Sequence, residues 1–295
     1  MQKERREKNM KISQSIGEFR KYTEVTKSKG TTDFYKFYLR SIDKHLGQIE
    51  TESITNNDIL DYILIIRKNS PEISNASLNK HIVTLKTVVT YTTGRKITFQ
   101  KLKEQKKLTD TISDKTVSKI FSHYQKNLSD RFAFRNYVYL RLMLDTGLRM
   151  NEMNNLKFRD IDFDTNSIHV VITKTNVDRI VCFTESTSEL LWKFVVTQKI
   201  KKYLFFDFLT NEMLTTSSVE CFIYRIKKRL LITESITPHK WRHTFATYYL
   251  RNGGNLETLR MLLGHSNLKT TQRYLHLSTN DISVDYKKAM QYREY

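Results

Sequence analysis

The chain has 295 residues, with 50 Lys and Arg against 31 Asp and Glu, so its formal net charge is +19. Residues 1–107 contribute +10 (22 basic, 12 acidic) and the remainder +9 (28 basic, 19 acidic), so the excess is not confined to a tail. This distribution favours a polyanion such as nucleic acid as partner, although a generally basic soluble protein remains an alternative. No apolar run reaches the roughly 18 residues that cross a bilayer, which argues against a membrane protein.

The first residues are charged and lack a following apolar stretch, so we expect no secretory signal. Cys182 and Cys221 are too few for a disulfide framework and are not spaced as zinc ligands. We therefore expect a cytoplasmic protein without a structural metal.

Residues 10–93 are predicted to form four helices, because apolar side chains recur every three or four positions. Thr55 or Asn57 begins the third helix, and Pro71 follows its end. The apolar stripes are Phe19, Tyr22 and Val25; Phe34, Phe37, Tyr38 and Leu46; Ile59, Tyr62, Ile63 and Ile66; and Leu78, Ile82, Leu85, Val88 and Val89. A plain four-helix bundle explains these stripes equally well, and only the basic residues Lys80, Lys86, Arg95 and Lys96 favour DNA.

The helical periodicity fades after residue 96, and lysines become frequent. We interpret residues 99–112 as a linker between a helical domain (1–98) and a second domain (113–295). A run of charges is usually only solvated, but this one lies between two basic domains. It is predicted to contact DNA phosphates through Lys101, Lys103, Lys106 and Lys107.

Helices return in residues 115–157. Val117, Ile120 and Phe121 mark the first, and the second is mostly apolar and hence buried, with Phe132, Tyr137, Tyr139, Leu140 and Leu144. Gly147 ends it and Arg149 follows directly, with Glu152 three residues on and able to orient it. An arginine at such a place is either a structural ion-pair partner or a functional group held in position.

A β-hairpin is predicted next, because Ile168, Val170 and Ile172 alternate with polar residues and Ile180 and Cys182 follow a polar turn. Lys174 lies in that turn. Two further helices, 185–197 and 217–232, come before residue 237. The second carries Arg225, Lys227 and Lys228, a predicted DNA-facing surface.

Residues 237–276 contain four of the eight histidines. Thr237 and Pro238 are typical of a helix start, and Gly253-Gly254 of its end. Helical spacing places His239, Arg242 and His243 on one side, opposite the apolar residues Trp241, Phe245, Tyr248 and Tyr249. A second helix, 256–263, is predicted to stop at Gly264, just before His265, and a third to carry Arg273 and Tyr274.

These residue types suit one chemistry. An arginine grips two phosphate oxygens, a histidine transfers protons near neutral pH, and a tyrosine can act as a covalent nucleophile. His239 and His243 could together bind a metal, but no third ligand is evident. The set indicates metal-free phosphoryl transfer through a phosphotyrosine.

The order of these residues resembles the tyrosine recombinases, the phage-integrase and Xer-type family. That family has Thr-Gly-Leu-Arg, a hairpin lysine, His-x-x-Arg, Leu-Gly-His and a tyrosine about nine residues later. The matching positions are Arg149, Lys174, His239, Arg242, His265 and Tyr274. The family's Gly-Lys-Gly is Thr173-Lys174-Thr175 here, which changes the loop but keeps the lysine.

The resemblance implies a mainly α fold with a small antiparallel sheet (α+β): a helical core-binding domain followed by a catalytic domain. It implies Tyr274 as nucleophile, Lys174 as general acid, and no cofactor or metal. The implied partners are double-stranded DNA with an inverted-repeat core site and a homotetramer assembled by exchange of C-terminal tails. An accessory DNA-bending protein remains open. The tail has helical spacing at Ile282, Tyr286, Ala289 and Met290, and a cap on its own domain is equally open.

The implied activity is site-specific recombination, for integration or excision of a mobile element or for dimer resolution. Two alternatives remain. A type IB topoisomerase-like enzyme would share the chemistry, and an inactive DNA-binding regulator would share the fold; the complete set of six residues argues against the latter.

Overall fold

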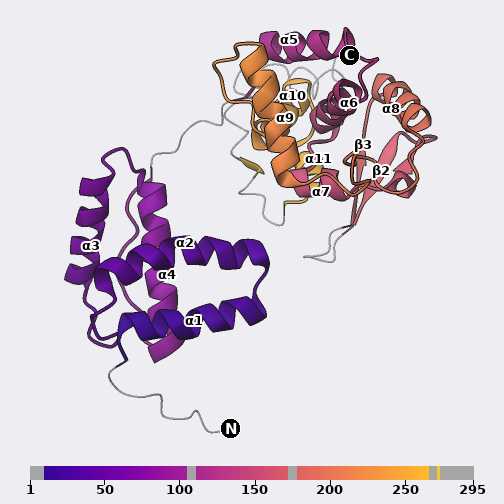
Figure 1. Ribbon diagram of the computed structural model, residues 1–295. Coiled ribbons are helices and arrows are strands. Elements are labelled where there is room, and N and C mark those ends of the chain that lie inside the picture. Colours follow the sequence, from indigo (N-terminus) through magenta and orange to yellow (C-terminus); the bar gives the residue numbers. More distant parts are fainter. Residues whose placement is uncertain (1–9, 105–110, 172–177, 266–270, 273–295) are drawn as a thin grey trace, which may run out of the picture. The chain divides into compact units, whose positions relative to one another are not determined.

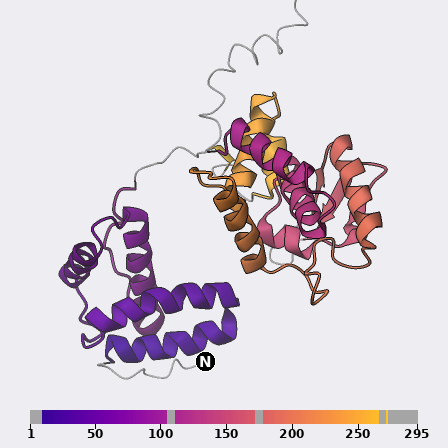
Figure 2. The ribbon, with the colours of Figure 1, turned by 45° about the horizontal axis from the view of Figure 1, so that its top comes forward.

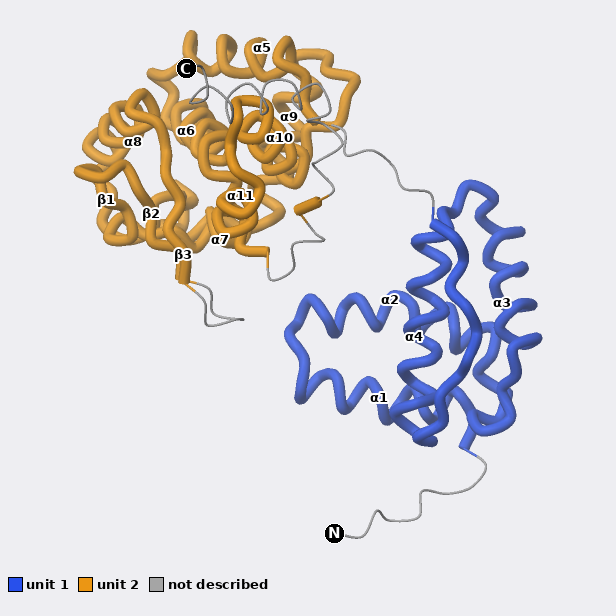
Figure 3. Tube along the Cα trace, turned by 180° about the vertical axis from the view of Figure 1, so that it is seen from behind, with its two compact units in different colours: residues 1–107 blue, residues 108–295 orange. Residues whose placement is uncertain are grey.

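The computed structural model describes residues 10–104, 111–171, 178–265 and 271–272 (Figure 1). Lys106, Lys107, Lys174, Arg273, Tyr274 and the C-terminal tail lie outside the described residues. The chain divides into two compact units, residues 1–107 and 108–295 (Figure 3). In the predicted linker, Phe99 and Leu102 pack against the core of the first unit, whereas Ile112 belongs to the core of the second.

The described part of the first unit contains four helices: α1 (Ile12–Thr26), α2 (Lys29–Leu46), α3 (Asn56–Asn69) and α4 (Asn75–Thr93). Helix α3 begins as expected, because the Thr55 side chain accepts a hydrogen bond from the backbone N–H of Asp58. Helix α4 ends at Gly94, whose φ of 75° is a left-handed conformation that glycine adopts at little cost. Helices α1 and α2 lie side by side, and both also pack on α4 (Figure 1).

Parts of two predicted apolar stripes are wrong. Val25 and Phe37 are 87% and 70% exposed, and Phe34 is 39% exposed. A helix turns about 100° per residue, so a repeat of three drifts about 60° at each step, and Val25 leaves the face on which Phe19 lies. The predicted residues Tyr38 and Leu46 are buried, and Leu39 and Ile42, which the predicted stripe omitted, complete the core side of α2.

A buried polar cluster lies inside this unit. The Tyr62 hydroxyl donates to Ser41 Oγ at 2.9 Å and lies 2.8 Å from His81 Nδ1. Burial lowers the pKa of His81, and burial raises the pKa of Tyr62 to about 12, although its hydrogen bond with Ser41 opposes the rise. The folded unit therefore favours a neutral His81.

This neutral histidine makes the first unit sensitive to acid. Below the ordinary histidine pKa of about 6.5, the unfolded chain takes up a proton that the folded unit resists, so stability falls as the pH falls. We expect lower amide protection factors, that is, the intrinsic exchange rate divided by the observed rate at the same pH, in α3 and α4 of the full chain at pH 5.5 than at pH 8. His81→Gln is expected to reduce this pH difference, and an equal difference in both proteins would contradict the role of His81.

The second unit is built around the buried helix α6 (Arg131–Thr146), which contacts α5 (Asp114–Gln125), α8 (Glu185–Gln198) and α10 (Pro238–Arg251). Its other elements are α7 (Met150–Asn155), the 3₁₀ helix η1 (Phe158–Asp160), α9 (Thr216–Arg229) and α11 (Leu256–Leu263) (Figures 1 and 2). Phe132, predicted as buried, is 41% exposed, whereas Phe134 in the same turn of α6 is buried.

A three-stranded antiparallel sheet lies in this unit, in the order β1 (Ile161–Asp162), β2 (Ser167–Val170) and β3 (Arg179–Cys182). The predicted hairpin is present, and β1 is an additional strand. Ile180 and Cys182 face outward, with Ile180 61% exposed, whereas Val181 is buried opposite Ile168. The alternation of a strand therefore places Arg179 on the same inward side as Val181.

The predicted fold class, mainly α with a small antiparallel sheet, is confirmed. No helix in the described parts of the chain has the length and apolar content that crossing a membrane requires.

Candidate active site

Arg149 follows directly after the turn that ends α6. Gly147 closes that helix with a φ of 61°, Leu148 is fully buried, and Arg149 occupies the N-cap position of α7. The backbone N–H of Arg149 donates to Glu152 Oε2 at 2.7 Å. This bond satisfies one of the free N–H groups at a helix start and fixes the direction in which the Arg149 side chain leaves the backbone.

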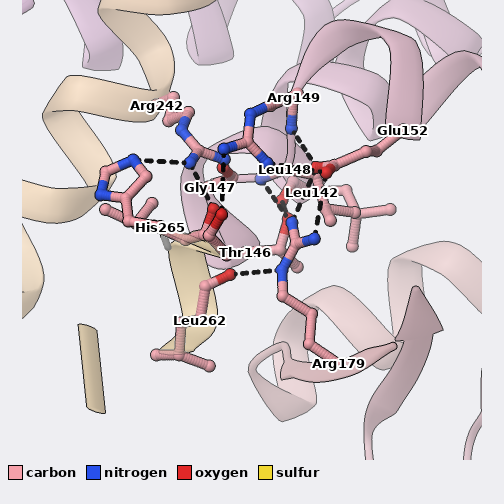
Figure 4. Close-up of polar contacts among 12 residues, drawn as sticks. Leu142, Thr146, Gly147, Leu148, Arg149, Glu152, Arg179, Arg242, Leu262 and His265 are labelled. Atoms are coloured by element: carbon pink, nitrogen blue, oxygen red, sulfur yellow. Dashed lines mark hydrogen bonds and ion pairs between the residues drawn. The ribbon is translucent and has the colours of Figure 1, made fainter. Parts of the chain in front are cut away.

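The Arg149 guanidinium is only partly used by the protein. It donates to Glu152 Oε1 at 3.0 Å and to the carbonyl oxygen of Gly264 at 3.2 Å, and the side chain is 40% exposed (Figure 4). A guanidinium has five N–H donors, so these two bonds leave donors for a ligand. Glu152 thus orients Arg149 as the sequence suggested.

Arg242 is held more tightly, in the buried part of α10. Its guanidinium donates to the carbonyl oxygen of Gly147 at 2.7 Å and to that of Leu263 at 2.5 Å. Only 5% of the residue is exposed, and its neighbour Trp241 is fully buried in the core of the second unit. Helix α10 begins with Pro238 as predicted, but Thr237 makes no capping hydrogen bond through its side chain.

Three arginines donate hydrogen bonds to carbonyl groups at the end of α11. The last carbonyl groups of a helix have no partner within it and carry partial negative charge. Here the carbonyl oxygens of Leu262, Leu263 and Gly264 accept from Arg179, Arg242 and Arg149, in that order. Gly264 itself has a φ of 61°, which turns the chain so that His265 follows immediately.

His265 is neutral in this arrangement. Its Nε2 lies 3.1 Å from Arg242 Nη2, and a guanidinium can only donate, so Nε2 accepts. The ring proton is therefore on Nδ1, which lies 3.0 Å from the hydroxyl of the buried Thr271. A hydroxyl can either donate or accept, so Thr271 can serve either tautomer of the ring.

A cavity of about 460 Å³ opens beside these residues. Both Arg149 and Arg242 line it, together with the exposed His239 and, from α9, Tyr224 and Lys227. The predicted residues Arg149, Arg242 and His265 are thus brought together, and His239 is at the same cavity. Lys174 and Tyr274 lie outside the described residues.

His243 is half-buried on α10. Among the described residues, no three or more His, Cys, Asp and Glu side chains are grouped so that they could hold a metal ion.

The predicted DNA-facing residues that the structure describes differ in their surroundings. Lys227 lines the cavity, and the described exposed members are Lys80, Arg95, Lys96, Lys101, Lys103, Arg225 and Lys228. Lys86 is different, because it is half-buried and its ammonium group donates to the carbonyl oxygen of Phe99. Arg95 likewise donates to the carbonyl oxygen of Ile54 at 2.7 Å, so part of its donor capacity is used within the unit.

Two residues of this site were missed in the sequence. Arg179 makes a double hydrogen bond with Glu152, with Nη1–Oε1 at 3.0 Å and Nη2–Oε2 at 2.7 Å, and only 7% of its side chain is exposed (Figure 4). The signal that could have found Arg179 is its alternation with Val181 and Phe183, but the predicted apolar pattern uses Ile180 and Cys182 instead. Thr271, the partner of His265, had no such signal.

Glu152 receives every hydrogen bond that it can accept. Its two oxygens take two N–H groups from Arg149 and two from Arg179, and a carboxylate offers about four acceptor sites. Burial raises the pKa of Glu152, but the hydrogen bonds and charges of Arg179 and Arg149 outweigh it and leave the pKa below its usual value. Glu152 is therefore a carboxylate at neutral pH.

Comparison with known proteins identifies the family. Residues 110–281 match the model of the phage integrase family. The tyrosine recombinase XerC of Staphylococcus aureus is 30% identical over 281 residues, which cover 92% of each chain. The tyrosine recombinase XerA of Saccharolobus solfataricus is 40% identical over 168 residues, 56% of this chain and 54% of that protein.

Solved structures share the fold. The Tn1549 transposon integrase, in complex with transposon right-end DNA, superposes with a TM-score of 0.78 at 18% identity, covering 96% of this chain and all of that one. A lambda integrase dimer bound to a core site gives a TM-score of 0.73 at 19% identity, covering 90% and 95%. With the family-model match and the relative that aligns along most of the chain, these findings show that the chain belongs to the phage integrase family of tyrosine recombinases.

Proposed function

We propose that this recombinase cleaves and rejoins double-stranded DNA at a specific core site, using Arg149, Arg242, His265, His239, Lys174 and Tyr274. The observation that carries the proposal is that Arg149, Arg242 and His239 line one cavity, with His265 in contact with Arg242. Lys174 and Tyr274 are proposed from the sequence motif alone. Two arginines bind the oxygens of a phosphodiester and offset the charge that develops on them during transfer. The DNA complexes of the structural relatives support the same partner.

The proposed reaction has two steps. The Tyr274 oxygen attacks the scissile phosphorus and forms a 3′-phosphotyrosine, while His239 helps to take the phenolic proton. The bond to the 5′ oxygen breaks, and Lys174 supplies the proton for the leaving hydroxyl. A 5′ hydroxyl from a partner duplex then attacks the phosphotyrosine and releases Tyr274, so bond energy is conserved.

His265 is proposed to donate a hydrogen bond to a non-bridging oxygen. In the described arrangement its Nε2 accepts from Arg242, so this role requires a proton on Nε2. Thr271 supports the change, because its hydroxyl can donate to Nδ1 once that nitrogen has lost its proton. The tautomer is thus set by whichever group lies opposite Nε2.

The surroundings of the reaction are also proposals. The exposed basic residues, with Lys106 and Lys107, are proposed to follow the DNA backbone, and Lys86 the least because its ammonium group is engaged. We further propose a homotetramer on an inverted-repeat site, joined by tail exchange, acting in the cytoplasm in integration, excision or dimer resolution. The topoisomerase-like alternative differs in needing only a monomer.

A covalent-complex assay tests the nucleophile. Wild type and Tyr274→Phe are incubated, with a chelator present, with nicked duplexes made from the DNA that flanks the gene. We expect a covalent protein–DNA band with wild type and none with Tyr274→Phe, while both bind DNA equally, because only the phenolic oxygen is removed.

Two results would contradict the proposal. A band that survives Tyr274→Phe would mean a different nucleophile. Binding by both proteins without linkage across all the flanking sites would favour the inactive regulator. Pairing of two duplexes in the same reaction would separate recombination from topoisomerase-like relaxation.

A further inference from the structure

The strand next to the predicted Lys174 loop places an arginine in the interior of the second unit. Arg179 is paired with Val170 in the register of the sheet and shares the inward side with Val181. Its side chain is 7% exposed, and three of its N–H groups donate at 3.0 Å or less, two to Glu152 and one to the Leu262 carbonyl oxygen. Burying a guanidinium is costly unless it is paired, so its partners define its role.

Glu152 creates a problem for the phosphate-binding role of Arg149. A carboxylate beside a guanidinium is itself an oxygen anion with the geometry that a phosphate presents. With Arg149 alone the ion pair has no net charge, and the carboxylate competes with DNA for the same donors. With Arg179 included, the three groups carry a net charge of +1.

The geometry indicates that Arg179 neutralises the charge of Glu152. Its contact with Glu152 uses both terminal nitrogens, at 2.7 and 3.0 Å, between side chains that are 7% and 13% exposed. Arg149 reaches Glu152 through one side-chain nitrogen at 3.0 Å and is 40% exposed. The stronger, less solvated pair is therefore Arg179–Glu152, and Arg149 keeps most of its charge and donors for a ligand.

We propose that Arg179 is a positioning residue: by neutralising Glu152, it keeps Arg149 available to the DNA phosphate. This inference deepens the proposed function and rests on it. Arg179 also holds the Leu262 carbonyl oxygen, next to the carbonyl groups that take Arg242 and Arg149, and its guanidinium packs 3.0 Å from the position of a Cβ on Gly264. The same side chain thus aligns the turn that carries His265.

Charge removal at Glu152 separates this role from a purely structural one. Arg179→Gln leaves the Glu152 carboxylate to Arg149, so covalent cleavage at saturating DNA is expected to slow about 10²-fold, as for loss of one oxyanion donor. Adding Glu152→Gln removes the competing anion, so the double variant is expected to cleave at least about tenfold faster than Arg179→Gln. If Arg179 only held the fold, the double variant would be no faster than Arg179→Gln.

Two more variants complete the design. Arg179→Lys keeps the positive charge but loses the paired N–H donors of the guanidinium. Its cleavage rate is expected to lie between those of wild type and Arg179→Gln. Arg141 is the matched control in the same unit, since its guanidinium bonds only the hydroxyls of Ser186 and Thr187 among the described hydrogen bonds, and Arg141→Gln is expected to cleave at the wild-type rate. Should Arg179→Gln unfold, Arg179→Lys and the double variant decide the question: rates about 10²-fold below wild type for both would overturn the proposal.

A binding measurement keeps this test independent of cleavage. The slope of log binding constant against log salt, on intact duplex, reports the number of phosphates neutralised. It is expected to fall by about 1 in Arg179→Gln, because the Arg149 contact is lost, and to return in the double variant. An unchanged slope with an unchanged cleavage rate would overturn the role of Arg179. Absence of any covalent product from wild type would instead count against the proposed function, and the slope would still report on Arg179.

Discussion

Arg242→Lys is expected to slow covalent cleavage about 10²–10³-fold at saturating DNA. The guanidinium simultaneously reaches the carbonyl oxygens of Gly147 and Leu263 and the ring of His265. A lysine keeps the charge but places its donors on one nitrogen, which cannot span these partners and also meet a phosphate. The unpaired buried carbonyl groups also cost about 1–3 kcal/mol of stability each.

The measurement is the single-turnover rate of covalent complex formation, with melting temperature recorded for each variant. Arg251→Lys is the matched control, because Arg251 is exposed in the last turn of the same helix. It is expected to keep the wild-type cleavage rate and, because lysine keeps the charge, the wild-type salt dependence of binding. Wild-type cleavage by Arg242→Lys would show that Arg242 has only a structural part.

Gly147→Ala is expected to destabilise the second unit by about 2–5 kcal/mol. Roughly 1–2 kcal/mol comes from a side chain at a φ of 61°, and about 1–3 kcal/mol from overpacking. A Cβ at this position would lie 2.2 Å from Cδ1 of the Phe245 ring, so the ring or the turn must move. The melting temperature should fall by roughly 5–15 °C. Cleavage should also slow, since the Gly147 carbonyl oxygen holds Arg242 and Arg149 follows two residues later.

Gly94→Ala separates the backbone strain of an alanine at positive φ from the steric overlap with Phe245. Gly94 also has a positive φ, 75°, but no atom lies within 4 Å of its would-be Cβ. It is expected to cost only the strain, about 1–2 kcal/mol. The part of the Gly147→Ala destabilisation that exceeds the cost of Gly94→Ala is attributed to the contact with Phe245. Adding Phe245→Leu to Gly147→Ala should recover some of that part. If the two alanine variants were equally stable, contact with Phe245 would not be the cause.

Much of the architecture follows from local sequence. Helix starts and ends depend on residues a few positions apart, such as Thr55 with Asp58, Pro238 at the start of α10, and Gly147 and Gly264 at the ends of α6 and α11. These signals act within one or two turns, so they are readable without knowledge of the rest of the chain. The errors at Val25 and Phe37 arose where apolar spacing alone was used, because burial depends on which helices pack against that face.

The candidate active site likewise has features that local motifs predict and features that depend on long-range packing. The proposed catalytic residue types and their order could be predicted from the sequence, because the motifs around Arg149, His239–Arg242 and His265 are short and contiguous. Long-range packing sets three features that no motif indicates: Arg179 binds Glu152, Thr271 faces His265, and three carbonyl groups at the end of α11 each accept from a different arginine. The physical reason is that a buried charge or carbonyl must find a partner, but which distant residue supplies it is set by packing.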